Sequence, residues 1–381
     1  MLQRLLHAIL PAALLACLTL LNAGCGLDYY VPLVRGTFDS VFRARPVTAV
    51  LADPSVPEAT KAKLRLVQEI REFARTEIGQ SVGSAYSHYD DDSAVSATGT
   101  IGYSLSAAAK DGFTPYTWDY PFIGRAEYRG YFSLEQARAE RDRLTEAGYD
   151  TSLSIISGFS TLGVLPDPVR SSQIELPDEA LVELLLHELS HRTVFKPNDT
   201  LFNETMASAI GRQAARHFYR TRRPADAPET LVALAFYDDE DVVDEFVTRV
   251  FDELTAYYAQ PIGRDEKIAG RQVRFDALAA IFEVDFRPRL SRPDQWRGPA
   301  NLTLNNSIIL SAARYRGNLP VYRRVLEKLD GRFADVWDVL RRASRQSDSL
   351  GWLERWLEGE ADRVRPPPEL QSCGATASDV P

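Results

Sequence analysis

The chain has 381 residues, of which 45% are apolar and 25% charged, and its net charge at pH 7 is −9. These fractions are those of a globular protein and exclude a disordered, collagen-like or coiled-coil chain. The acidic balance argues against nucleic-acid binding, because a phosphate backbone requires a basic surface. With three cysteines and no CxxC pair, neither a disulfide framework nor a cysteine-based zinc or redox site is expected.

The first 24 residues have the composition of an export signal. Arg4 precedes an uncharged run over 8–21, which is too short to span a membrane as a helix. Small residues and then Cys25 follow, as in a bacterial lipobox, although Asn22 occupies the place of the usual aliphatic residue. We expect a signal peptide over 1–24, a lipid anchor at Cys25 and a location on the periplasmic side of the cell envelope. The alternative is a plain cleaved signal with an incidental cysteine.

After the signal, apolar spacing and turn residues predict a predominantly helical α+β chain. In the first half, a helix is expected over 57–79, a Ser133-capped helix over 133–148 and a strand over 151–157. The glycine-bounded segment 159–163 follows this strand and is interpreted as an exposed edge strand.

The second half is expected to be helical throughout. The predicted helices are an apolar one over 179–195 that Asp178 caps, one starting at Asn203, two long ones at 229–258 and 264–285, and two or three over 304–357. Acidic and basic residues on one face of the two long helices predict a solvated antiparallel hairpin. We expect one unit over 25–365, consisting of an α/β part (25–177), two zinc-site helices (178–222) and a helical part (223–365), before a disordered tail over 366–381.

The sequence His187-Glu188-Leu189-Ser190-His191 indicates a metal site. Residues four apart share a helix face, so the two imidazoles can bind one ion, and neutral imidazole is a favoured zinc ligand. Glu188 lies beside the first ligand, where it can act as a general base without binding the metal. Two ordinary histidines on a helix are the alternative, but the helix is apolar on most sides, and buried polar groups need partners.

A third ligand has to come from elsewhere, and no other histidine is well placed. Glu204 follows His191 by 13 residues, on a face that continues with small residues and lets two helices approach closely. It could instead merely stabilise the start of its helix through the helix dipole. Asp199 and Glu229 remain alternative ligands.

The segments HELSHRTVF at 187–195 and FNETMA at 202–207 resemble the HExxH…NExxA pattern of gluzincin-type zinc metallopeptidases. More specifically, the chain resembles the bacterial "predicted aminopeptidase" family of exported lipoproteins. Further matching blocks lie at 29–30, 34–36, 43–46, 128–132, 160–163 and 305–306, and at Tyr315. The resemblance implies a zincin-like core with a small sheet beside the HExxH helix. It also implies Zn²⁺ held by His187, His191 and Glu204, with Glu188 as the base.

The expected reaction is hydrolysis of a peptide substrate, in which Glu188 takes a proton from water and passes it to the leaving amine. Tyr315 is the candidate donor to the developing oxyanion, with Asn306 and Arg314 as alternatives. Ser160, Thr161, Leu162 and Gly163 could pair with an extended substrate by strand addition, and Asn306 could also contact it.

Three other functions remain open at this stage. An endopeptidase or another zinc hydrolase would use the same residues. A non-catalytic lipoprotein that scaffolds envelope partners is a different class, and the intact Glu188 weighs against it.

Overall fold

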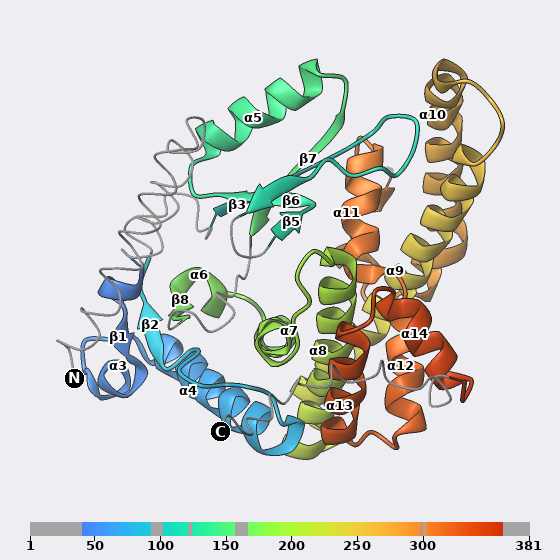
Figure 1. The fold of residues 1–381 in the computed structure, drawn as a ribbon. Helices are drawn as coiled ribbons and strands as arrows, with labels where there is room; N and C mark the ends of the chain where they lie inside the picture. The colour runs from blue at the N-terminus through green and yellow to red at the C-terminus, as the bar shows by residue number, and fades with distance from the viewer. Residues whose placement is uncertain are drawn as a thin grey trace, which may run out of the picture.

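The computed structural model describes residues 40–92, 102–120, 124–156, 167–296, 298–299 and 302–360. Within these residues the protein is a mostly helical α+β fold with small sheets (Figure 1). The elements of the first half are β1 (Arg45–Pro46), α3 (Val47–Ala52), α4 (Glu58–Phe73) with a π-helical turn (Ala74–Ile78), β2 (His88–Asp90), β3 (Gly102–Ala108), β4 (Trp118–Tyr120), β5 (Gly124–Ala126), β6 (Tyr128–Tyr131), α5 (Leu134–Glu146), β7 (Asp150–Ile156), β8 (Val169–Arg170) and α6 (Ser171–Ile174).

The second half is helical in the residues that the structure describes. Its elements are α7 (Asp178–Thr193), α8 (Thr200–Arg222), α9 (Pro228–Tyr258), α10 (Arg264–Ile281), a π-helical turn (Phe282–Phe286), two 3-10 turns (Arg287–Arg289 and Pro293–Gln295), α11 (Asn306–Arg316), α12 (Leu319–Lys328), α13 (Phe333–Ser344) and α14 (Ser349–Leu357). Residues 304–357 thus form four helices instead of the expected two or three. No helix among the described residues combines the length and apolarity needed to span a bilayer.

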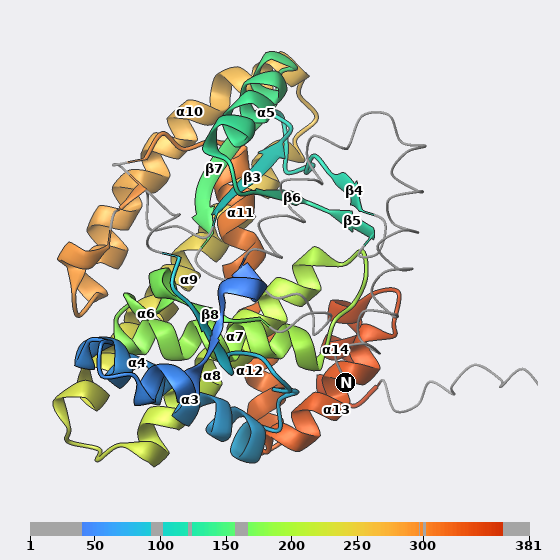
Figure 2. The same cartoon turned by 90° about the vertical axis from the view of Figure 1, so that its left-hand side faces the viewer.

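The largest antiparallel sheet has the strand order β6-β3-β7 and separates two environments (Figure 2). Side chains alternate across a strand, so neighbouring residues of β3 face opposite sides. Leu105 is fully buried in an apolar cluster with Ala137 and Leu144 of α5. Ser104 and Ser106 instead line a cavity between the sheet and α7. The sheet therefore contributes one wall of that cavity.

Helices α7 and α8 pack side by side in the main core, and both begin at positions that differ from expectation. Asp178 is the first residue of α7, not its cap, since the chain enters the helix directly from Pro177. Helix α8 begins at Thr200 because the Asp199 carboxylate accepts a hydrogen bond from the Phe202 N–H. Asn203, the expected start, instead exchanges two hydrogen bonds with the backbone of Lys196.

The close approach of α8 to α7 depends on Gly211. A Cβ atom at this position would lie 2.9 Å from both N and Cα of His187, which is too close for a backbone that cannot rotate away. The absence of a side chain therefore sets the distance between the two helices at the first histidine of the HExxH motif.

Gly211→Ala is expected to push His187 out of position. Overpacking of this kind costs roughly 1–3 kcal/mol of stability, and it should also weaken metal binding, because His187 moves with its backbone. Urea unfolding and zinc titration would measure the two effects. Ala214→Gly is a suitable control, since it changes the same helix without adding an atom. Equal zinc affinity in Gly211→Ala and the native protein would contradict the assigned role.

The prediction that the two long helices form a solvated antiparallel hairpin is only partly correct. Helices α9 and α10 pack through a second apolar cluster that contains Phe246, Leu254 and Phe275. Asp239, Glu240 and Asp244 of α9 are buried, so the acidic residues of this helix are not simply a solvated face. Glu240 and Asp244 form ion pairs with arginines of α8 and α11, which charge counting within one helix cannot reveal.

Candidate metal centre

Three predicted ligands converge in the interior. The Nε2 atoms of His187 and His191 lie 3.1 Å apart, and each lies 3.5 Å from Oε2 of Glu204. The three side chains are at most 15% exposed. Two imidazole nitrogens and a carboxylate oxygen at this spacing could hold one metal ion. In the described part of the chain, no other group of three such side chains converges in this way.

The alternative third ligands lie elsewhere in the fold. Asp199 caps α8 and pairs with Lys196 at 2.8 Å, while Glu229 lies in the first turn of α9. Neither belongs to the converging group. Glu204 reaches the histidines because it lies in the second turn of α8, on the face that packs against α7.

Tyr128 completes the surroundings of Glu204 and was not identified from the sequence as a site residue. Its hydroxyl donates a hydrogen bond of 3.1 Å to Oε1 of Glu204, the oxygen that faces away from the histidines. The Glu204 carboxylate and burial raise the pKa of Tyr128 well above its usual value, so the hydroxyl remains a donor. Tyr128 lies on β6, 76 residues before Glu204, and this long separation left no local signal.

The pKa values of Glu204, His191 and Glu188 are set by two opposing effects, burial and the charges of neighbouring side chains. Burial alone raises the pKa of Glu204, but charge attraction and hydrogen bonds from His191 and His187 outweigh it, and the net pKa is lowered. Burial lowers the pKa of His191, yet Glu204 and Glu188 raise it overall. The pKa of Glu188 is raised because burial destabilises its carboxylate more than the two histidines stabilise it. The Nδ1 atom of His191 is buried without a hydrogen-bond partner among the described residues.

A cavity of about 800 Å³ connects these groups to solvent. Glu188 lines it directly beside the converging side chains, as a general base would require. Tyr315 of α11 also lines it, with its ring centroid 6.3 Å from that of His187 and 38% of its surface exposed. Desolvation, and then the Glu204 carboxylate, raise the pKa of Tyr315, so its hydroxyl is protonated at neutral pH.

The two alternative oxyanion donors differ in location. Arg314 lines the cavity and is 2% exposed, with its guanidinium bonded to Glu127 and 5.6 Å from the centre of the Tyr128 ring. Asn306 does not line the cavity, and its buried amide donates to three backbone carbonyls and accepts from the Tyr258 hydroxyl. Its hydrogen bonds join α11 to the segment after β3, so Asn306 does not fit a substrate-binding or oxyanion role.

Five predicted site residues lie outside the described residues: Cys25, Ser160, Thr161, Leu162 and Gly163. Their assignments to a lipid anchor and to substrate binding remain predictions from the sequence.

Comparison with known proteins gives one informative match. No curated protein and no solved structure matches the chain. A family model described as "Putative aminopeptidase" matches residues 28–350, a range that includes the cavity and all three converging side chains. The match covers most of the 381 residues. The chain therefore belongs to this aminopeptidase family.

Proposed function

We propose that the protein is a zinc-dependent aminopeptidase of the bacterial cell envelope with a zincin-like core. The observation that carries this proposal is the buried convergence of His187, His191 and Glu204 in the wall of a large cavity. A His₂Glu donor set is that of catalytic zinc sites, in which a fourth position is left for water. The family membership supports a peptide as the substrate.

Zinc at this position would supply Lewis acidity and a water activated for attack at neutral pH. The protein's own residues provide the proton transfers. Glu188 accepts the proton of the attacking water and then donates it to the leaving amine, so its carboxylate returns to its starting state. Tyr128 holds Glu204 by the oxygen that does not face the histidines, which fixes the orientation of this ligand.

The developing negative charge on the scissile carbonyl needs a donor besides the metal. Tyr315 suits this role, because it lines the cavity and its ring centroid lies 6.3 Å from that of His187. Arg314 lies next to it in α11, but its guanidinium is engaged by Glu127.

Tyr315→Phe is expected to lower kcat by about tenfold to a thousandfold, because one oxyanion donor is lost. KM and zinc content should stay close to the native values, since the change removes one hydroxyl. Tyr128→Phe is the matched comparison, and it should instead weaken zinc binding by about tenfold to a hundredfold. Steady-state kinetics and zinc titration separate the two tyrosines. If Tyr315→Phe kept native turnover, Tyr315 would not be the oxyanion donor, and Arg314 would be the next candidate.

Activity on a panel of amino-acyl and N-blocked peptides tests the proposed function. Zinc-dependent cleavage of free-amine substrates only would support an aminopeptidase. Cleavage of blocked peptides would indicate an endopeptidase, and the absence of hydrolysis from a zinc-loaded protein would favour a scaffolding lipoprotein.

The cell-envelope location is proposed from the lipobox alone. Cys25→Ser is expected to convert a membrane-sedimenting protein into a soluble or unprocessed one, because the acyl chains could no longer be attached. Fractionation and mass spectrometry of the N-terminus would measure this. Unchanged membrane association of the variant would contradict lipidation at Cys25.

A further inference from the structure

The cavity has a second feature next to the candidate metal centre, a network of ion pairs joining α7, α8, α9, α11 and α12. Its centre is Arg212, which is 5% exposed and contacts four carboxylates. Arg316 shares two of these carboxylates, with both contacts at 2.6 Å. In the described part of the chain, the network consists of Glu183, Asp238, Glu240, Asp241 and Asp244 with Arg212, Arg216, Arg316 and Arg323.

Among the described residues, carboxylates outnumber guanidinium groups by one in this network. It contains five carboxylates against four guanidinium groups. The excess is the same when the two most exposed members, Asp238 at 67% and Arg323 at 40%, are left out. Two of the carboxylates, Glu183 and Glu240, line the cavity. Their hydrogen bonds with arginine use one oxygen each, Oε1 of Glu183 and Oε2 of Glu240. Buried charge without full compensation is costly, so a cation from the cavity would stabilise this arrangement.

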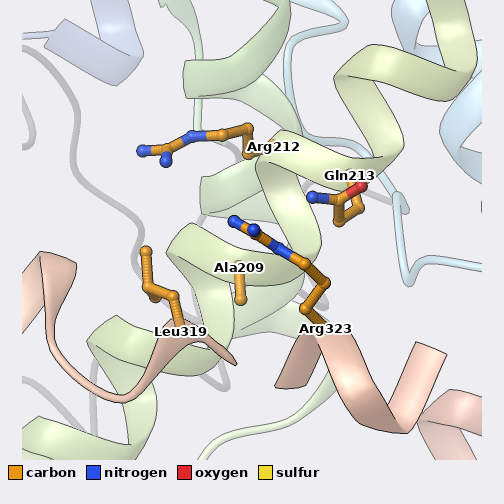
Figure 3. Close-up of a pocket in the computed structure, with 5 residues that line it drawn as sticks. All are labelled: Ala209, Arg212, Gln213, Leu319 and Arg323. Carbon is orange, nitrogen blue, oxygen red and sulfur yellow. The ribbon is translucent and has the colours of Figure 1, made fainter. Parts of the chain in front are cut away.

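A small void lies beside the network between α8 and α12, and no carboxylate lines it. Its lining residues are Arg212, Arg323, Ala209, Gln213 and Leu319 (Figure 3). The void has a volume of about 10 Å³, which is space for about one water molecule. The large cavity is therefore the side from which a ligand can reach Glu183 and Glu240.

Glu183 and His187 lie on the same helix and line the same cavity. The two residues are one helical turn apart on the same face of α7, a rise of about 6 Å. In a peptide with a free N-terminus, the amine nitrogen and the first carbonyl carbon are separated by one Cα atom, or about 2.5 Å. A peptide whose first carbonyl lies at the candidate metal centre would therefore have its ammonium group in the cavity that Glu183 also lines.

The two ends of the cavity also differ in accessibility. At the Glu183 end the charged side chains are between 5% and 23% exposed, for Glu183, Arg212, Glu240 and Arg316. At the other end, the side chain of Arg125 is 67% exposed and Asn198 is exposed. A peptide chain can leave by this second end, whereas its N-terminus would fit the enclosed one.

We propose that Glu183, supported by Glu240, binds the free α-ammonium group of the peptide substrate and thereby makes the enzyme an exopeptidase. This inference rests on the proposed aminopeptidase function and identifies the residue that sets its specificity. Arg212 holds the Glu183 carboxylate in place through its 3.0 Å contact. Arg212 is shared among four carboxylates, so it does not compensate Glu183 alone.

Ligand binding can test this without catalysis. The full chain carrying Glu188→Gln and loaded with zinc would be titrated calorimetrically with the amides of alanine, leucine and phenylalanine and with their N-acetyl forms. The free amines should bind about tenfold to a hundredfold more tightly, as expected for a charged hydrogen bond. Adding Glu183→Gln should abolish this preference, and adding Glu240→Gln should reduce it. Equal binding of acetylated and free amides, or no binding of either, would overturn the proposal.

Two controls separate an effect on the amine from a disturbance of the network. Asp241→Asn removes a carboxylate that contacts Arg212, Arg216 and Arg323 but does not line the cavity, and it should leave the preference intact. If Asp241→Asn lost the preference for free amines as fully as Glu183→Gln does, the role of Glu183 would be structural. With active enzyme, Glu183→Gln should lower kcat/KM for free-amine peptides at least tenfold. If the native protein cleaves no peptide, the proposed function fails, while the binding result still decides the role of Glu183.

Discussion

Replacement of Glu188 by glutamine is expected to lower peptidase turnover by about two to four orders of magnitude, the range that general acid–base catalysis contributes. Glutamine has nearly the same shape but cannot accept the proton of the attacking water. Zinc content should remain at the native level, because Glu188 lines the cavity but is not one of the three converging ligands. Turnover and zinc content measured on the same preparation would test both expectations.

Glu179→Gln is the matched control for this variant. Glu179 lies on the same helix, pairs with Arg292 at 3.5 Å and does not line the cavity, so turnover should be unchanged. Native turnover in Glu188→Gln would exclude Glu188 as the base and direct attention to another proton acceptor.

Arg212→Met is expected to reduce the free energy of unfolding by roughly 3–5 kcal/mol, the cost of removing one partner from a buried ion pair. Methionine fills much of the same space, so the loss comes mainly from carboxylates of Glu183, Glu240 and Asp244 left without their shared cation. Arg212→Lys keeps the charge but not the planar fork of donors, and its loss should be smaller. Urea denaturation monitored by circular dichroism would measure these differences.

A surface arginine of the same helix provides the reference for this comparison. Arg220 is exposed near the end of α8, and Arg220→Met should change stability by no more than about 0.5 kcal/mol. Equal stability of Arg212→Met and Arg220→Met would show that the network contributes little to folding.

The converging group of His187, His191 and Glu204 could be predicted from the sequence because the pattern that indicates it is local. A four-residue spacing places His187 and His191 on one helix face, and the small residues after Glu204 allow α8 to pack closely against that face. Gly211 shows how closely α8 approaches α7, since a Cβ atom there would collide with the His187 backbone. Helix periodicity and side-chain size indicated these positions, and the resemblance to the HExxH…NExxA pattern implied Glu204 over Asp199 and Glu229 as the third ligand.

The remaining parts depend on contacts between segments that are far apart in the chain. Tyr128 meets Glu204 across 76 residues, and Arg212 meets Glu240 across 28. The acidic residues of α9 indicated a solvated face, because a helix considered alone does not show which arginines cover it. Asn306 was an alternative oxyanion donor in the sequence, but in the fold Asn305 caps α11 and Asn306 anchors it to the segment after β3.

The most direct test of the central claim is the zinc content of the native protein and of Glu204→Ala after dialysis against zinc and then against buffer. Plasma mass spectrometry should find one zinc per chain in the native protein and much less in Glu204→Ala, since the variant retains only two of the three protein ligands. Asp199→Ala, which removes a helix cap and not a ligand, should retain one zinc. A native protein without zinc, or full zinc content in Glu204→Ala, would contradict a centre built from His187, His191 and Glu204.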